Sequence, residues 1–214
     1  MNNLIIIVDS LERARFFKRL HPEILKNKST TIITSEPLVY LNNKLSGINC
    51  DLITLKNFKY DDLTDMETTN NIEYLNNDIS INESKRIYLS AYNLILSKLL
   101  SKKDRVVMWN GQQILCRAAT RAALEIGCNT TYLEISNLPS KLFSDSLGVN
   151  ANSSIAKNIE KLDGLKSVNE IKHKEWVNNY EFEKTKTLPQ SRSKKTNLLI
   201  SLLNSLVKKT YKSV

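Results

Sequence analysis

The sequence predicts an α/β fold, with a Rossmann-like parallel sheet that carries helices on both faces. Short apolar runs alternate with segments in which apolar residues recur at helical spacing, and this order repeats about five times along the 214 residues. Such alternation is typical of a parallel sheet, because each crossover helix returns the chain to the same end of the next strand. Hydrophobic residues make up 41% of the chain and charged residues 25%, which favours a packed core over disorder.

The strands are predicted from short runs rich in apolar and β-branched residues, of which residues 4–8 form a continuous apolar run that indicates burial on both faces of a sheet. These runs cover residues 4–8, 30–34, 51–55, 105–109 and 130–134. Residues 57–82 are rich in Asp, Glu, Asn and Thr, and we interpret them as an irregular insertion with short helical pieces, most simply a solvated surface loop.

Helices are predicted between the strands from apolar residues at 3.6-residue spacing and from residues that favour helix ends. Ser10 and Ser35 are candidate N-caps, and Pro37 suits a first helical turn. Further helices are expected at 83–100 and 112–126, with Gly127 as a left-handed C-cap, and from Ser153 to about residue 162.

The chain is expected to divide into a Rossmann-like lobe, residues 1–165, and a helical extension with a basic linker, residues 166–214. Residues 185–196 resemble a linker and residues 198–207 a short apolar helix. From Lys184 onward there are eight basic residues and no acidic one, so the remaining 183 residues carry only +1 of the net charge of +9. This distribution argues against a nucleic-acid-binding face, which would spread positive charge over the folded body.

Other classes of protein are disfavoured by what the sequence contains. Three cysteines without metal-type spacing suit reduced thiols in a cytoplasm, and two histidines argue against a His-rich metal site. No apolar window approaches the roughly 18 residues of a membrane span. Neither a G-x-G-x-x-G nor a G-x-x-x-x-G-K-[ST] motif occurs, so a dinucleotide site or a P-loop is not expected.

Ligands of open parallel sheets bind at the carboxyl ends of the strands, near the point where the strand order reverses. The polar residues that directly follow the predicted strands are therefore the candidate site residues. They are Asp9, Ser10, Ser35, Asn110, Gly111, and Glu134 through Asn137. Trp109 is expected to pack at the end of its strand rather than to stack on a ligand.

Two carboxylates, Glu134 and Asp145, stand eleven residues apart, one at a strand end and one on the loop that follows. One loop can return both to a single crevice, where two carboxylates can divide the roles of nucleophile and acid or base at a sugar centre. The plainer interpretation is a helix cap or a surface charge. Gly148 suits a tight turn, and Asn150, Ser153 and Ser154 offer donors to a carboxylate or phosphate.

Residues 134–154 read E-x-x-N-L-P-x-K-x-x-x-D-x-x-G-V-N-A-x-S-S and are preceded by V-M-W-N-G at 107–111. This pattern resembles the bacterial capsule polysaccharide and lipopolysaccharide synthesis family, whose members include retaining β-Kdo glycosyltransferases (Kdo is 3-deoxy-octulosonic acid) that use CMP-Kdo. The resemblance implies the N-terminal lobe of a GT-B glycosyltransferase. By the same resemblance, Asp145 is the nucleophile, and Glu134 an acid/base or positioning group.

Several further expectations depend on this resemblance. Asn110, Gly111, Asn137, Gly148, Asn150, Ser153 and Ser154 are expected to contact substrate. Lys141 and Arg117 are candidate cations for the Kdo carboxylate, although Arg117 also suits an ordinary helix salt bridge. No cofactor or metal is expected beyond the donor CMP-Kdo, and the acceptor would be a glycolipid or a polysaccharide.

A GT-B enzyme has two lobes, and this chain has the length of one. The alternative hypothesis is therefore a non-catalytic acceptor-binding or scaffolding module that works with a separate donor-binding lobe. The expected location is the cytoplasm. The basic tail could contact anionic headgroups peripherally at the inner membrane, or it could be only a linker.

Overall fold

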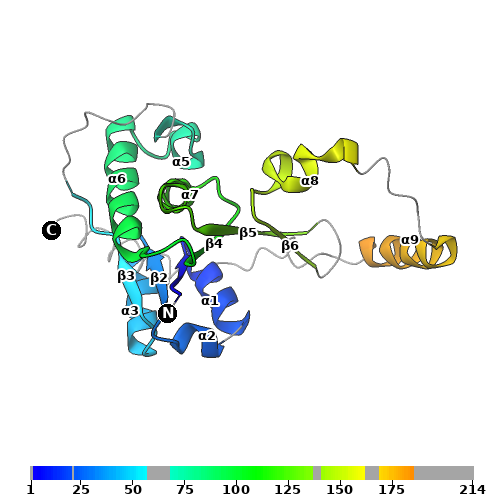
Figure 1. Ribbon diagram of the computed structural model, residues 1–214, viewed down its shortest axis with the longest axis horizontal. Helices are drawn as coiled ribbons and strands as arrows, with labels where there is room; N and C mark the ends of the chain where they lie inside the picture. Colours follow the sequence, from blue (N-terminus) through cyan, green and yellow to red (C-terminus); the bar gives the residue numbers. More distant parts are fainter. Residues whose placement is uncertain (1, 21, 57–67, 137–140, 162–168, 186–214) are drawn as a thin grey trace.

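The computed structural model describes residues 2–20, 22–56, 68–136, 141–161 and 169–185. It confirms the α/β class: a six-stranded sheet in the order β3-β2-β1-β4-β5-β6 lies between helices (Figure 1). The first five strands pair in parallel, and β6 pairs antiparallel with β5. The strands are β1 (Leu4–Ile7), β2 (Thr30–Thr34), β3 (Cys50–Leu52), β4 (Arg105–Trp109), β5 (Asn129–Ile135) and β6 (Leu142–Asp145).

Helices on both faces bury the two sets of alternating strand residues. Ile6, Val8 and Ile32 pack on one face against α1 (Leu11–Leu20), α2 (Pro22–Lys26) and α3 (Pro37–Leu45). Ile5 and Ile7 pack on the other face against α6 (Ile81–Lys98) and α7 (Ile114–Ile126). Each fully buried aliphatic side chain contributes about 1.5 to 3 kcal/mol to the stability of the fold. A strand with helices on both faces gains this contribution from apolar residues at successive positions.

The predicted helix ends are confirmed at four of five positions, one of them Ser153, whose side chain caps the short helix Ser154–Lys157. The Oγ of Ser10 accepts a hydrogen bond from the amide of Arg13 (3.3 Å), Pro37 begins α3, and Gly127 ends α7 in the left-handed conformation with φ 75°. The predicted cap at Ser35 is wrong, because the chain enters α3 one residue later. Glu36 takes the N-cap position there without a side-chain hydrogen bond.

Other element boundaries differ from the prediction. The strand expected at residues 51–55 is Cys50–Leu52, and the helix expected from Ser153 to 162 is broken into α8 (Ser154–Lys157) and the 3-10 turn Ile159–Lys161. Within the polar insertion, residues 72–75 form the short helix α5 (Ile72–Leu75), whereas residues 57–67 lie outside the described residues. The linker expected at 185–196 lies outside them from residue 186 onward, and the helix expected at 198–207 does so entirely.

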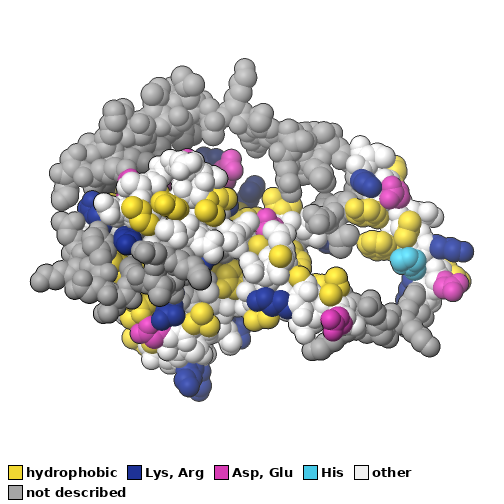
Figure 2. Space-filling model, turned by 90° about the horizontal axis from the view of Figure 1, so that it is seen from above, with side chains coloured by type: hydrophobic (Ala, Val, Ile, Leu, Met, Phe, Trp, Pro, Cys, Tyr) yellow, Lys and Arg dark blue, Asp and Glu magenta, His cyan; other side chains and the backbone are white. Residues whose placement is uncertain are grey.

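The strand β6 and the short helix α2 were not predicted, whereas the helix α9 (Glu170–Lys184) lies within the helical extension expected from residue 166. Figure 1 shows α9 away from the parallel strands, beyond β6. Its aromatic residues His173, Trp176 and Tyr180 stack along the helix, and Figure 2 shows hydrophobic side chains beside charged ones on this part of the surface. Among the described helices, none combines the length and apolarity needed to cross a membrane.

Candidate functional site

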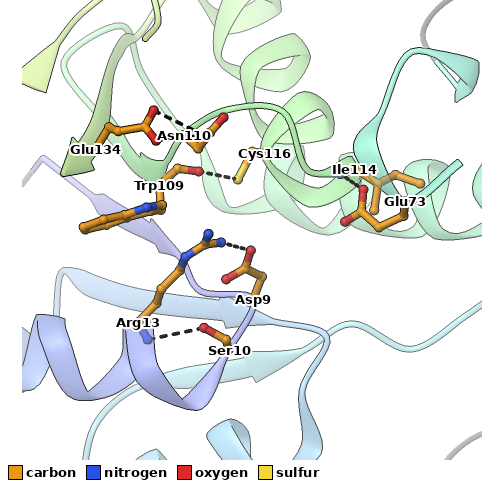
Figure 3. A network of polar contacts seen from close by, with 9 residues as sticks. All are labelled: Asp9, Ser10, Arg13, Glu73, Trp109, Asn110, Ile114, Cys116 and Glu134. Carbon is orange, nitrogen blue, oxygen red and sulfur yellow. Dashed lines mark hydrogen bonds and ion pairs between the residues drawn. The ribbon is translucent and has the colours of Figure 1, made fainter. Parts of the chain in front are cut away.

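The candidate site lies at the carboxyl edge of the sheet, where the strand order reverses. From β1 the chain builds outward to β2 and β3 on one side, then crosses to β4 and β5 on the other. The connections that leave the carboxyl ends of β1 and β4 therefore run to opposite sides of the sheet. Open sheets bind ligands in the crevice between two such connections. Asp9 and Ser10 follow β1, and Asn110 and Gly111 follow β4, as the sequence predicts (Figure 3).

A tight turn at Asn110 and Gly111 shapes the centre of this edge. Both residues have positive φ, 63° and 92°, which glycine tolerates and asparagine tolerates better than most residues. The amide of Asn110 donates to the carbonyl of Leu133 on β5 (2.8 Å), and this contact fixes the turn to the neighbouring strand. Asn110 is thereby placed with its side chain toward the end of β5.

The Glu134 carboxylate is held by two asparagine amides. Nδ2 of Asn110 lies 3.3 Å from each carboxylate oxygen, and Nδ2 of Asn150 lies 3.4 Å from Oε2. Glu134 is only partly buried, so water and ligands can still reach its carboxylate. Asn150 comes from the 3-10 turn after β6, with a left-handed φ of 52°, so the sequence-distant turns at 110 and 150 meet at one side chain.

Asp145 ends β6 and is buried, with only 8% of its surface exposed. Its Oδ1 accepts from the amides of Leu147 (2.7 Å) and Gly148 (3.2 Å), and its Oδ2 accepts from the amide (3.0 Å) and the Oγ (2.5 Å) of Ser154. Burial by itself raises the pKa of Asp145, but the hydrogen bonds from Ser154, Leu147 and Gly148 outweigh it and hold the pKa below its ordinary value. Asp145 is therefore ionised at neutral pH, with all of its acceptor sites in use.

The strand register relates the two carboxylates. Tyr132 lies opposite Asp145, and Glu134 lies opposite Phe143. Residues opposite one another in an antiparallel pair share a face, so Glu134 and Asp145 project from the same face as diagonal neighbours, about 7 to 8 Å apart between Cα atoms. The register thus places both side chains on one face of the sheet, while the expectation that one loop returns both to a single crevice stays a prediction.

The serine hydroxyls of the turn after Asp145 are hydrogen-bonded to other groups of the same turn. Ser153 Oγ donates to the carbonyl of Asn150 (2.8 Å) and accepts from the amide of Ala156 (3.1 Å), while Ser154 serves Asp145. At Gly148 a Cβ would come within 2.8 Å of the Cβ of Asn152, so glycine is required there. Direct substrate contact by Asn150, Ser153 and Ser154 stays a prediction.

The remaining predicted residues fall in three places. Lys141 is exposed and precedes β6, where its carbonyl accepts from the amide of Ser136, toward the tip of the β5–β6 hairpin and away from Asp145. Asn137 lies outside the described residues. Arg117, on α7, lines a pocket of about 270 Å³ whose wall also includes Asn110, Gly111 and Gly148. Neither Glu134 nor Asp145 is among its lining residues.

Two polar groups beside this edge were missed by the sequence interpretation (Figure 3). Arg13 pairs with Asp9 and lies over the ring of Trp109, 5.8 Å from its centroid. Trp109 also packs edge-on against Phe16, which agrees with the expected packing role. The i, i+4 spacing of Asp9 and Arg13 could have indicated the ion pair.

Glu73 is the second missed group. Its carboxylate reaches from α5 to the first turn of α7 and accepts from the amide of Ile114 (3.0 Å). Burial raises the pKa of Glu73 above its ordinary value. Glu73 lies within the polar insertion, where no spacing in the sequence distinguishes it from the acidic residues around it.

Within the described ranges, no cluster of three or more His, Cys, Asp and Glu side chains could hold a metal ion. Cys116 is buried on α7 beside Ala119 and Ala123, as is typical of a structural thiol. Comparison of the sequence with protein-family models and with curated proteins finds no match.

Proposed function

We propose that this chain is the acceptor-binding and catalytic lobe of a retaining glycosyltransferase that transfers Kdo from CMP-Kdo. The observation that carries the proposal is the placement of Glu134 and Asp145 on one face of adjacent strands, at the carboxyl edge of a Rossmann-like sheet. The sequence pattern at residues 134–154, which resembles β-Kdo glycosyltransferases, supports the choice of sugar.

In the proposed reaction, an Asp145 oxygen attacks the anomeric carbon of Kdo while the bond from that carbon to the phosphate oxygen of CMP breaks. CMP leaves with the electron pair, and a Kdo ester of Asp145 remains. An acceptor hydroxyl then attacks the same carbon, Glu134 takes its proton, and Asp145 is released as a carboxylate. Two inversions give net retention.

The electrostatics of both groups suit these roles. The depressed pKa of Asp145 keeps it ionised, as a nucleophile must be. Glu134 remains accessible and is oriented by Asn110 and Asn150. In this scheme the Ser154 hydroxyl leaves Oδ2 of Asp145 as the oxygen attacks, since Oδ2 accepts from that hydroxyl in the structure.

A second candidate, a non-catalytic acceptor-binding module, is favoured by one specific observation. Each oxygen of Asp145 accepts two hydrogen bonds from its own turn, as expected of a carboxylate whose work is to hold residues 145–154 in place. Such a module would bind the acceptor beside Glu134 and leave the chemistry to a partner lobe.

The test incubates the full chain with CMP-Kdo and either a Kdo-terminated glycolipid or a polysaccharide acceptor. The measurements are CMP release, the anomeric configuration of the product, and the intact mass of the protein. The transferase hypothesis expects turnover with retention and, in Glu134→Gln, accumulation of a protein one Kdo residue heavier. Asp145→Asn should abolish both.

Glu12→Gln, at an exposed position on α1, is the control and should retain full activity. Thermal unfolding of each variant separates loss of chemistry from loss of the fold. Acceptor binding without turnover by the native chain supports the module instead. Undiminished transfer by a folded Asp145→Asn protein would remove the nucleophile from the mechanism.

A further inference from the structure

The pocket beside the candidate site carries a distinctly basic wall. It lies between α7 and the segment that runs from β6 to α8, and its volume is about 270 Å³. Arg117 and Arg121, four residues apart on α7, line it from one side, and Lys157 of α8 lines it from the other. None of the described residues that line it is acidic. Three cations thus converge on one small cavity.

Among the three cations, Arg117 is the one held most firmly at the cavity wall. Its Nε is buried and has no hydrogen-bond partner within the described part of the chain. Nε has no accessible surface, so a ligand in the cavity does not reach it unless the side chain turns. Arg117 does line the cavity, so an oxyanion bound there can meet the rest of its guanidinium group in a strong, charge-assisted hydrogen bond. Arg117 itself is only partly exposed, so it is positioned by packing rather than free in solvent.

A buried side chain and closely packed backbone form the remaining walls of the pocket. Tyr132 is buried, and its hydroxyl lies 2.8 Å from Oγ1 of Thr120, another lining residue. Gly111 and Gly148 bring backbone close to the cavity at positions where a Cβ would collide with a neighbour. The volume is just below the range of about 300 to 1,000 Å³ typical of ligand sites, so it suits one sugar-sized group rather than a whole nucleotide.

We infer that this pocket binds a small molecule through an oxyanion, a carboxylate or a phosphate, with Arg117 as the main anchor and Arg121 and Lys157 adding positive charge. The inference stands independently of glycosyl transfer, because binding alone tests it. The pocket is distinct from the site of the two carboxylates, because neither Glu134 nor Asp145 lines the cavity. Asn110 connects the two features, since it lines the pocket and donates to Glu134.

The experiment titrates the isotope-labelled full chain with inorganic phosphate, free Kdo and CMP, each at constant ionic strength, and follows backbone amide resonances by NMR. Saturable shifts centred on Gly111, Thr120 and Gly148 are expected with at least one of the three probes. Shifts with phosphate and CMP identify a phosphate site, and shifts with Kdo alone identify a carboxylate site. The absence of saturable shifts at these amides with all three probes overturns the inference.

The affinities of three variants test whether Arg117 is the main anchor of the bound oxyanion. Arg117→Met keeps the apolar stem and removes the charge, and it is expected to weaken binding at least tenfold, the effect of losing one strong charge-assisted hydrogen bond. Lys157→Met, on an exposed residue, should weaken it severalfold and tests the site even if position 117 tolerates no change.

Arg15→Met removes the same charge from an exposed position on α1 and should leave the affinity within twofold of the native value. A folded Arg117→Met protein that binds as tightly as the native chain would refute the role of Arg117. Equal weakening by Arg15→Met would show that only net charge matters, and would refute the pocket.

Discussion

The ring of Tyr132 lies directly against the backbone of Gly111, so that a Cβ at position 111 would come within 2.8 Å of Cδ1 and 2.9 Å of Cε1. Tyr132 is 5% exposed, and its hydroxyl is bonded to Thr120, so the ring cannot easily withdraw. This contact joins the turn after β4 to β5 and forms part of the pocket wall.

Replacement of Gly111 by alanine is therefore expected to destabilise the protein by two effects, a positive φ of 92° and a collision with Tyr132. Gly47→Ala is the matched control, since Gly47 has φ 70° and open space around the position of a Cβ. Urea unfolding should show a loss of about 1 to 2 kcal/mol for Gly47→Ala, from backbone strain alone. For Gly111→Ala it should show about 1 to 3 kcal/mol more, from overpacking. Equal losses would mean that the ring moves aside.

The hydrogen bonds to Asp145 should make stability depend on pH in the acid range. Because the folded-state pKa lies below the unfolded value of about 3.9, the stabilisation is complete above about pH 5 and is lost as the pH falls through the folded-state pKa. Ser154→Ala removes the hydroxyl donor and should cost about 2 kcal/mol at pH 7. It should also raise the pKa of Asp145, measured by NMR titration of its carboxyl carbon. An unchanged pKa in Ser154→Ala would contradict the assigned role of Ser154.

Ionisation of Glu73 should affect the stability of the fold in the opposite sense to ionisation of Asp145. Its folded-state pKa is raised by burial, so the ionised form is penalised in the folded state at neutral pH, and that penalty disappears as the pH falls below the unfolded value of about 4.3. Glu73→Gln removes the charge while its amide oxygen can still accept from the amide of Ile114. The variant should be more stable than the native protein at pH 7, and the difference should shrink toward zero below pH 4.

Glu73→Ala provides the contrast, because it removes the acceptor as well as the charge. It should be less stable than Glu73→Gln at every pH, by about 1 kcal/mol, the typical effect of losing a side-chain acceptor at a helix N-terminus. Denaturant unfolding of the three proteins at pH 4 and pH 7 measures both effects. A Glu73→Gln protein less stable than native at pH 7 would show that the charge itself stabilises α7.

The three cysteines should differ in reactivity. Burial raises the pKa of Cys50 to about 11 and that of Cys116 further still, so neither forms much thiolate near neutral pH. Cys128 is only partly buried, and its pKa is raised less. Alkylation of the native protein at pH 8, followed by peptide mass analysis, should modify Cys128 first and the other two only on unfolding. Early modification of Cys116 would reveal local opening of α7.

The sequence predicted the strands near 4–8, 30–34, 105–109 and 130–134 because short runs rich in apolar and β-branched residues are typical of strands covered on both faces, and such a run is a local property. It missed β6, which is four residues long, lacks β-branched residues and forms only by pairing with β5. It gave no bounds for α9 within the expected helical extension, because that helix packs no single apolar face against a core.

The candidate site shows the same division. The residues at the carboxyl ends of the strands could be named in advance, because the alternation of strands and helices determines where those ends meet. The contacts of Asp145 with Ser154 and of Glu134 with Asn110 depend on how β6 and the two turns pack. Lys157 could not be assigned to a site, since it comes to the pocket from a helix forty residues beyond Arg117.

By itself, the sequence determined the class of fold, the strands of its parallel part and the edge of the sheet at which ligands are expected. Those features follow from periodicity within short segments, which burial imposes on neighbouring residues. Only the tertiary structure decided that Asp145 is enclosed by donors of its own turn and that three cations share one cavity. Those arrangements join residues distant in the chain, and their free energies exist only once the surrounding elements have excluded water and fixed the geometry.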